Sequence, residues 1–324
     1  DAGIHTINNE KIVIERCYIH DPRGRANPWY YAHPEGPVAI YLGSDSTNGN
    51  YVIRYNDFVG SELNRWNDAV MGFGNGQYDG SAYRDSDIYG NFFSLANDDG
   101  IELDGGQMNI RVFGNKFIHS LCGISTAPNM IGPSYIFRNV ISDLNDETGR
   151  VGAMVKNGGG RKYSSGLTVF INNTFVSKGL GIRSVGMGRE KDRATFRGFS
   201  RNNIIVVDGS EYTVVGDIHN TPEHDLDFDL LWNLEEETFK NEVQLDFDNQ
   251  SNRRRMGNVI VQGHPGIEKN AIVANPQFFS IENYRFDLQK SSPAIGTAVP
   301  VNNFTILNNV SDADKGAYEY GIIK

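Results

Sequence analysis

Apolar and polar residues alternate in short runs along the chain, and no segment shows the 3.6-residue apolar period of an amphipathic helix. A short motif recurs instead: one or two apolar residues, then Asn, then any residue, then Phe or Ile. It is centred on Asn56, Asn91, Asn115, Asn139, Asn173 and Asn203. The intervals between these positions are 35, 24, 24, 34 and 30 residues. The shortest interval is 24 residues and the others are longer. This indicates a coil of fixed minimum size that carries inserted loops at particular corners.

Such a repeat predicts an all-β fold, a right-handed parallel β-helix in which stacked coils bury a continuous core. The Asn is predicted to occupy a left-handed turn position and to hydrogen-bond its equivalents above and below, while the Phe or Ile points inward. Cys17 takes the Asn position in residues 13–19.

The repeat predicts one domain in two parts. The coils span residues 1–210, and residues 211–324 form the last irregular coils and a C-terminal cap, with a polar loop at 235–255. The segment 278–320 is predicted to cover the sheet edge that a solenoid's last coil would otherwise expose.

Composition narrows the possible partners. The 324 residues carry 39% hydrophobic and 22% charged residues, and no apolar run approaches the roughly 20 residues of a membrane span. A net charge of −10 argues against a nucleic-acid partner, which needs clustered Lys and Arg. The two cysteines, Cys17 and Cys122, fit no metal or redox spacing and are predicted to be buried free thiols. The chain opens on Asp1 with a strand pattern soon after, so we expect it either to start inside a larger precursor or to be a processed or engineered fragment.

An acidic stretch at residues 97–106 stands out from this background. Asp98, Asp99, Glu102 and Asp104 fall within seven residues, and the acids alternate with apolar residues as in a half-buried strand. The stretch is either a solvated edge or a strand that presents carboxylates for catalysis or cation binding.

Alignment of successive coils favours the second interpretation. It stacks Asp68, Asp99 and Cys122 at one corner and places Asn67 over Asp98. Adjacent parallel strands lie about 4.8 Å apart, so Asp68 and Asp99 should be about 5 Å apart. Carboxylates that close either share a proton or clamp a cation. We predict Asp99 and Asp68 as the central catalytic carboxylates, with Asp98 and Glu102 beside them.

Other residues are candidates for substrate contacts. They are Asp104, the insertion residues Arg65 and Trp66, His119, and Lys156 and Arg161 of a glycine-rich segment, with residues 29–33 as a groove wall. Aromatic rings stack on sugars and Arg binds uronate carboxylates. The alternatives are that Trp66 packs its loop, that His119 is structural, and that residues 156–162 are an ordinary loop.

The coils, the Asp-Asp-Gly-Ile at 98–101, the Ser-Pro-Ala-Ile-Gly at 292–296 and the Lys-Gly-Ala-Tyr-Glu-Tyr at 315–320 together resemble a known group. They resemble secreted bacterial right-handed parallel β-helix proteins of the pectate-lyase-like superfamily. The resemblance implies a secreted or periplasmic protein that acts on a polysaccharide in a groove along the sheets. Hydrolases of that superfamily follow Asp-Asp with Gly-His-Gly and Arg-x-Lys, whereas this chain offers only residues 119–123 as a counterpart.

Three functions follow as hypotheses. The leading one is a glycoside hydrolase that uses paired carboxylates and needs no cofactor. The second is a polysaccharide lyase with Lys156, Arg161 or His119 as base and calcium held by Asp98, Asp99 and Asp104. The third is a glycan-binding solenoid without turnover. The sequence leaves the sugar and its linkage open.

Overall fold

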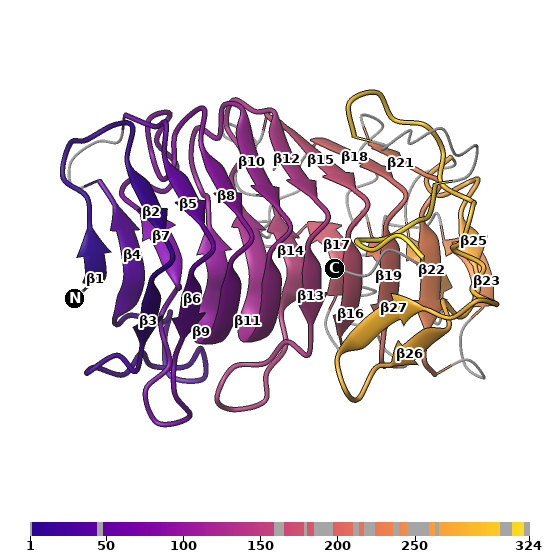
Figure 1. Ribbon diagram of the computed structural model, residues 1–324, viewed down its shortest axis with the longest axis horizontal. Helices are drawn as coiled ribbons and strands as arrows, with labels where there is room; N and C mark the ends of the chain where they lie inside the picture. The colour runs from indigo at the N-terminus through magenta and orange to yellow at the C-terminus, as the bar shows by residue number, and fades with distance from the viewer. Residues whose placement is uncertain are drawn as a thin grey trace.

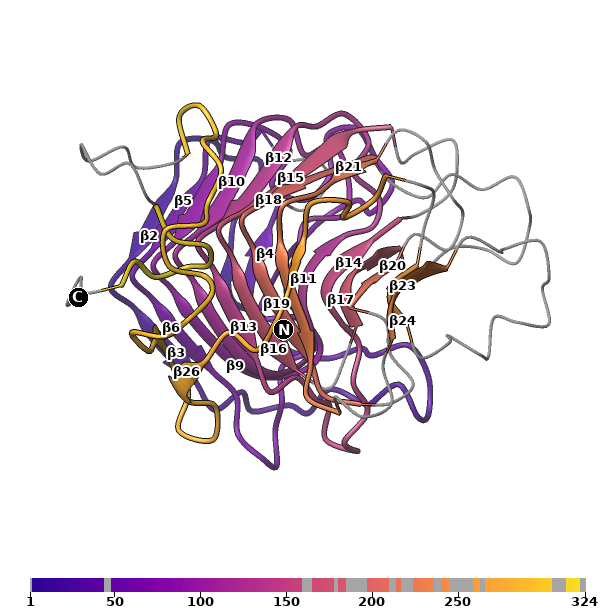
Figure 2. The ribbon, with the colours of Figure 1, turned by 90° about the vertical axis from the view of Figure 1, so that its right-hand side faces the viewer.

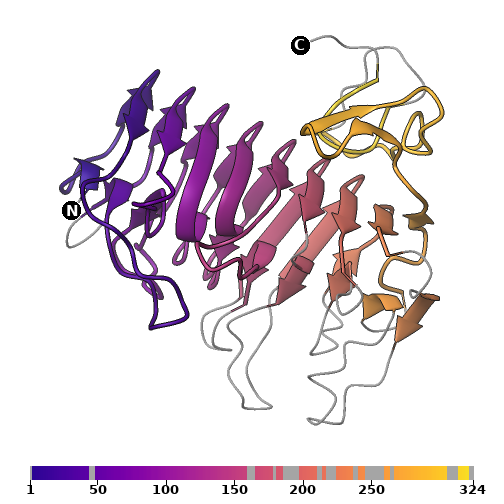
Figure 3. The ribbon, with the colours of Figure 1, turned by 90° about the horizontal axis from the view of Figure 1, so that it is seen from below.

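The structure is a computed structural model that describes residues 2–43, 48–158, 165–177, 180–184, 197–209, 214–216, 224–235, 240–244, 259–262, 266–304 and 313–320. Within these ranges the chain forms 27 strands and no helix, as the short alternating runs predict. Every pairing within the two large sheets is parallel, and the strands stack along the long axis of the molecule (Figures 1 and 3). The fold is a right-handed parallel β-helix, which confirms the predicted class.

The first large sheet has 17 strands that wrap around a corner. They are β1 (Ala2–His5), β3 (Tyr18–His20), β4 (Val38–Leu42), β6 (Asp57–Val59), β7 (Val70–Gly72), β9 (Phe92–Glu102), β11 (Lys116–Thr126), β13 (Val140–Ser142), β14 (Ala153–Asn157), β16 (Thr174–Ser177), β17 (Leu180–Ser184), β19 (Ile204–Val207), β20 (Val215–Gly216), β22 (Leu230–Asn233), β23 (Lys240–Gln244), β24 (Val259–Gln262) and β25 (Ile272–Val273).

The second large sheet has eight strands, and a short antiparallel pair follows it. The eight are β2 (Val13–Glu15), β5 (Val52–Arg54), β8 (Asp87–Tyr89), β10 (Ile110–Phe113), β12 (Ser134–Phe137), β15 (Leu167–Ile171), β18 (Arg197–Arg201) and β21 (Asp225–Leu226), and the pair is β26 (Phe278–Ser280) with β27 (Arg285–Leu288). The view along the stack separates β13, β16 and β19 from β14, β17 and β20, with the β26 segment outside the former (Figure 2).

A ladder of buried asparagines joins the coils between the two sheets. The Oδ1 atom of Asn115 accepts from the backbone N–H and the Nδ2 of Asn91, and its own Nδ2 donates to Asn139 Oδ1 and to the carbonyl of Ile88, all at 2.9–3.0 Å. The same four bonds recur at Asn91, Asn139 and the later positions. The predicted ladder is therefore confirmed.

The left-handed turn residue is not the ladder asparagine, which corrects the prediction. Positive φ falls on the residue before it, such as Tyr55 (56°), Gly90 (65°), Gly114 (62°) and Arg138 (54°). None of these ladder asparagines has a positive φ, and the side chain of each bonds to the next coil. The recurrence of Asn thus reflects hydrogen bonding rather than tolerance of the left-handed conformation.

The residue two positions after each Asn forms the interior stack, as predicted. Phe58, Phe93 and Phe117 are at most 1% exposed, with ring centroids 5.0 and 4.6 Å apart in consecutive coils. Burial of three such side chains contributes about 1.5–3 kcal/mol each. Because each ring contacts the next, the stack fixes the coils in register.

The ladder ends on a carboxyl pair that the sequence did not reveal. Asp229 takes the next Asn position and accepts from the N–H and Nδ2 of Asn203 at 2.7 and 2.9 Å. Glu268 lies beside it, and burial and the Asp229 charge raise the pKa of Glu268 well above its ordinary value. Burial lowers the pKa of neighbouring Lys315, whose Nζ donates to the Phe228 carbonyl.

The C-terminal segment covers the flank of the last coils rather than only their end. Phe278, Phe286 and Leu288 pack against Val176 and Ile204, which point outward from β16 and β19. This segment therefore covers an apolar outer face, and its covering of the last coil's sheet edge stays a prediction. Cys122 is buried as predicted, but Cys17 is only half-buried, because it lies in the first, less covered coil.

Among the described residues, no helix is long and apolar enough to cross a membrane.

Candidate active site

The candidate site lies where β9 and β11 run through a corner of the large sheet as unbroken 11-residue strands. The turn residues Leu95 and His119 have φ values of 65° and 55°, so each strand bends without an inserted loop. In β9, Ile101 is completely buried and pairs with Val70 of β7 and Ile124 of β11. The acids of β9 therefore lie at fixed positions between two neighbouring coils.

Asp68 and Asp99 are the centre of the cluster. The N–H of Asp99 donates to Asp68 Oδ1 at 2.8 Å, and Asn67 Nδ2 donates to Asp68 Oδ2 at 2.9 Å. Asp99 pairs with Cys122 on the next strand, and the N–H of Asp98 donates to the Asn67 carbonyl at 3.0 Å. The predicted stacking of these positions at one corner is confirmed.

Lys156 is the cation of this cluster. Its Nζ lies 2.5 Å from Asp99 Oδ2; the Asp99 side chain is 0% exposed and that of Lys156 is 18% exposed. The strand β14 places it there, because Lys156 pairs with Ser125 of β11, which pairs with Glu102 of β9. Sequence reasoning named Lys156 but gave no signal that it would meet Asp99, 57 residues away.

Asp104 and Asp98 have partners of their own. Asp104 Oδ1 accepts from Ser125 Oγ at 2.6 Å and from the N–H of Ala127 at 2.7 Å. Asp98 Oδ1 accepts from Trp29 Nε1 at 3.2 Å, and its Oδ2 is 3.9 Å from His33 Nε2. Residues 29–33 therefore form a wall at the site, as predicted.

Burial and mutual repulsion shift the protonation of the acids. Burial raises the pKa of Asp68 and of Glu102 well above the ordinary values, and nearby carboxylates add to both shifts. Burial also raises the pKa of Asp98 to about 6 and that of Asp104 to about 7. Burial alone would lower the pKa of Lys156, but the surrounding carboxylates outweigh it and raise that pKa. The cluster carries more carboxylates than its one ammonium can balance.

The residues present fit a hard divalent cation. Asp68, Asp99 and Glu102 each offer an oxygen, and the three atoms lie within 4.8 Å of one another. Calcium–oxygen distances are about 2.3–2.6 Å, so oxygens around one ion lie up to about 5 Å apart. Asp99 Oδ1 and Glu102 Oε1 are buried without a hydrogen-bond partner. Unpaired buried oxygens and an all-oxygen donor set both favour calcium. This set differs from the predicted Asp98, Asp99 and Asp104.

Three of the predicted substrate contacts are buried or already paired with other residues. Arg65 is 4% exposed, and its guanidinium donates to the carbonyls of Asn145 and His119. Trp66 is 3% exposed within the core, which supports the packing alternative. His119 is paired with Asp143 at 2.9 Å on the outer corner, and Arg161 lies outside the described residues.

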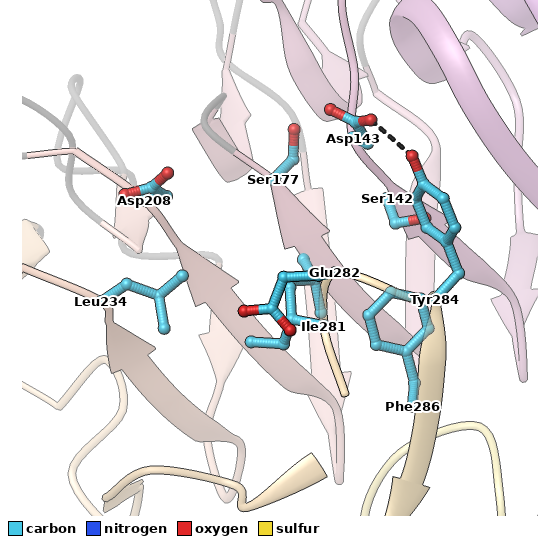
Figure 4. Close-up of a pocket in the computed structure, with 10 residues that line it drawn as sticks. Ser142, Asp143, Ser177, Asp208, Leu234, Ile281, Glu282, Tyr284 and Phe286 are labelled. Carbon is cyan, nitrogen blue, oxygen red and sulfur yellow. Dashed lines mark hydrogen bonds between the residues drawn. The ribbon is translucent and has the colours of Figure 1, made fainter. Parts of the chain in front are cut away.

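A hollow of about 260 Å³ lies between the coils that carry Ser142 and Ser177 and the C-terminal hairpin (Figure 4). Asp143, Asp208 and Glu282 line it, and Tyr284 Oη donates to Asp143 at 2.7 Å. No Lys, Arg or His is among its described lining residues. The described lining of the hollow therefore lacks the combination found in the acid cluster of β9, namely a lysine beside buried carboxylate oxygens that have no hydrogen-bond partner.

Comparison with known proteins gives one weak structural likeness, which carries no argument about fold or function. No protein-family model matches the chain, and no curated protein sequence matches it. One solved structure, described as the crystal structure of pectate lyase Pel9A, aligns over 95% of this chain and 97% of that chain. The identity is 12% and the TM-score 0.32.

Proposed function

We propose that the chain is a calcium-dependent polysaccharide lyase that cleaves a uronate-containing polymer by β-elimination. One observation carries the proposal: the Lys156 ammonium is inserted into a buried carboxylate cluster that has oxygens to spare for a cation. A purely structural ion pair would need one carboxylate, whereas this cluster holds five acids around one lysine. That the protein is secreted and that it has no nucleic-acid partner remain predictions.

The chemistry of elimination requires a base beside the carbon α to a uronate carboxylate. Lys156 in its neutral form takes that proton at Nζ, the bond from the β-carbon to the glycosidic oxygen breaks, and a carbon–carbon double bond forms. The departing oxygen takes up a proton from water, and Lys156 then gives its extra proton back to water. Asp68, Asp99 and Glu102 would hold a calcium ion, which would neutralise the substrate carboxylate and offset the carboxylate charges that keep Lys156 protonated.

Asp99 has a positioning role in this scheme. Its Oδ2 fixes the direction of the Lys156 amine, and its backbone N–H orients Asp68. Trp29 and His33 stand beside Asp98, and the His33 side chain is 65% exposed. These residues can hold a sugar ring and exclude water from the reacting carbon.

Hydrolysis is the second candidate, and the raised pKa values of Asp98 and Asp104 favour it. Carboxyls with a pKa of about 6 and about 7 are suited to general-acid catalysis near neutral pH. Yet Asp104 Oδ1 is committed to Ser125 and Ala127, and Asp99 is committed to Lys156. The elimination scheme uses both Lys156 and the unpaired oxygens of Asp99 and Glu102, so we prefer it.

The test is a digestion screen over uronate polysaccharides, scored for ultraviolet absorbance of unsaturated products with and without a chelator. Lys156→Met should reduce turnover by about 10²–10⁴-fold, the usual contribution of a general base. Lys116→Met, an exposed lysine on β11, is the matched control and should retain full rate. New reducing ends without absorbance would instead establish hydrolysis, and polymer binding without either product would leave a glycan-binding solenoid.

A further inference from the structure

An exposed arginine stands over the wall of the candidate site. The guanidinium carbon of Arg150 lies 5.5 Å from the centroid of the Trp29 ring. Among the described residues it forms no ion pair, whereas Arg25 on the facing loop is paired with Glu147. A cation stacked on an indole keeps its N–H donors free at the edges of the stack.

The loop that carries Arg150 is built rigidly. Asp146 Oδ1 accepts from the N–H of Thr148 at 2.8 Å and from the N–H of Arg150 at 3.0 Å, and the N–H of Asp146 donates to the Arg150 carbonyl at 2.8 Å. The next residue, Glu147, is tied to Asn97, which directly precedes the site acids. The Arg150 side chain takes no part in these bonds, so it is not needed to hold the loop.

Trp29 links this arginine to the acid cluster. One edge of the indole donates to Asp98, and the ring face carries the Arg150 guanidinium. The free guanidinium therefore lies one indole away from the carboxylates that surround Lys156. Planar guanidinium groups bind carboxylates through two parallel hydrogen bonds.

We propose that Arg150, stacked on Trp29, is an anion-binding subsite for the carboxylate of the uronate sugar next to the one that reacts. This inference rests on the proposed lyase function and names the residue that would select a polymer with consecutive uronates.

The experiment compares Arg150→Ala, Arg150→Lys and Arg285→Ala. Arg285 is the matched control, an exposed arginine whose guanidinium lies 4.8 Å from the Phe279 ring centroid on the C-terminal hairpin. Affinity electrophoresis in gels containing polygalacturonate or alginate, with calcium present, measures binding. Carboxyl-reduced forms of the two polymers provide the neutral comparison, and KM and kcat are measured wherever unsaturated product forms.

Arg150→Ala should weaken binding to the acidic polymer, or raise KM, by about 10- to 100-fold with kcat nearly unchanged. Binding to the reduced polymer should not change, and Arg150→Lys should fall between Ala and wild type. The subsite is overturned if Arg150→Ala behaves as Arg285→Ala does, or if the wild type binds acidic and reduced polymers equally. Arg150-dependent binding without unsaturated product would retain the subsite and refute the lyase assignment.

Discussion

Replacement of Asn115 by Ala tests the hydrogen-bond ladder that holds the coils together. The Asn115 side chain is fully buried and makes four hydrogen bonds of 2.9–3.0 Å, two to Asn91 and one each to Ile88 and Asn139. Each such bond contributes about 1 kcal/mol net, so the substitution should lower the free energy of unfolding by about 4 kcal/mol. Leaving buried partners unpaired makes this a lower bound.

The first rung offers an internal comparison. Asn56 makes three side-chain bonds rather than four, because Cys17 stands in the next Asn position and offers only its backbone N–H. Asn56→Ala should therefore destabilise by about 1 kcal/mol less than Asn115→Ala. Asn302→Ala, at an exposed position of the C-terminal segment, should have almost no effect.

Urea unfolding followed by far-ultraviolet circular dichroism measures all three variants. The urea midpoint should be highest for Asn302→Ala, lower for Asn56→Ala and lowest for Asn115→Ala. The slope should not change, since the slope reports the surface exposed on unfolding. A loss below about 1 kcal/mol at Asn115 would refute the bond count. Equal losses at Asn56 and Asn115 would show that burial, rather than the number of bonds, sets the effect.

Three further outcomes are expected. Calcium at about 100 times its Kd should stabilise the wild type by about 2.7 kcal/mol in thermal unfolding; Asp68→Asn should lose most of this gain, and an equal gain would exclude Asp68 as a ligand. Burial and Asp229 raise the pKa of Glu268, so the folded chain binds that proton more tightly than the unfolded chain, and the resulting stability is lost as pH rises through the folded-state pKa. Glu268→Gln should therefore flatten the fall of the urea midpoint with rising pH, whereas parallel profiles would contradict the assignment. Trp29→Phe removes a donor to Asp98 and should raise the carboxyl pKa above about 6 in carbon-13 NMR titration, and an unchanged value would show that the indole bond is weak.

The repeat made the coils and part of the site predictable. Because every coil carries the same Asn-x-Phe step, counting from that step set Asp68 beside Asp99 across two coils. The same step predicted the interior row of Phe58, Phe93 and Phe117. Local periodicity was sufficient there, since parallel pairing converts sequence offset directly into position.

The rest of the site depends on loops that the repeat does not encode. Trp29 reaches Asp98 across 69 residues and Lys156 reaches Asp99 across 57, and each follows an insertion of irregular length. The turn conformation was also misassigned, because an Asn next to a turn looks the same in sequence as an Asn within it. Only the structure shows that Arg16, Tyr55 and Gly90 adopt the positive φ.

The unlooped bends of β9 and β11 have a consequence for how such a protein could be remodelled. These two coils carry the minimum repeat of 24 residues between asparagines, while the walls come from insertions in neighbouring coils. Duplicating one 24-residue unit between β11 and β13 would move Lys156 and the loop that carries Arg150 together, by one strand spacing of about 4.8 Å, away from the acids of β9 and from Trp29. The ladder and the aromatic stack would continue through the added unit. One duplication would therefore separate the lysine from Asp99 and the arginine from its indole while the coils stay joined.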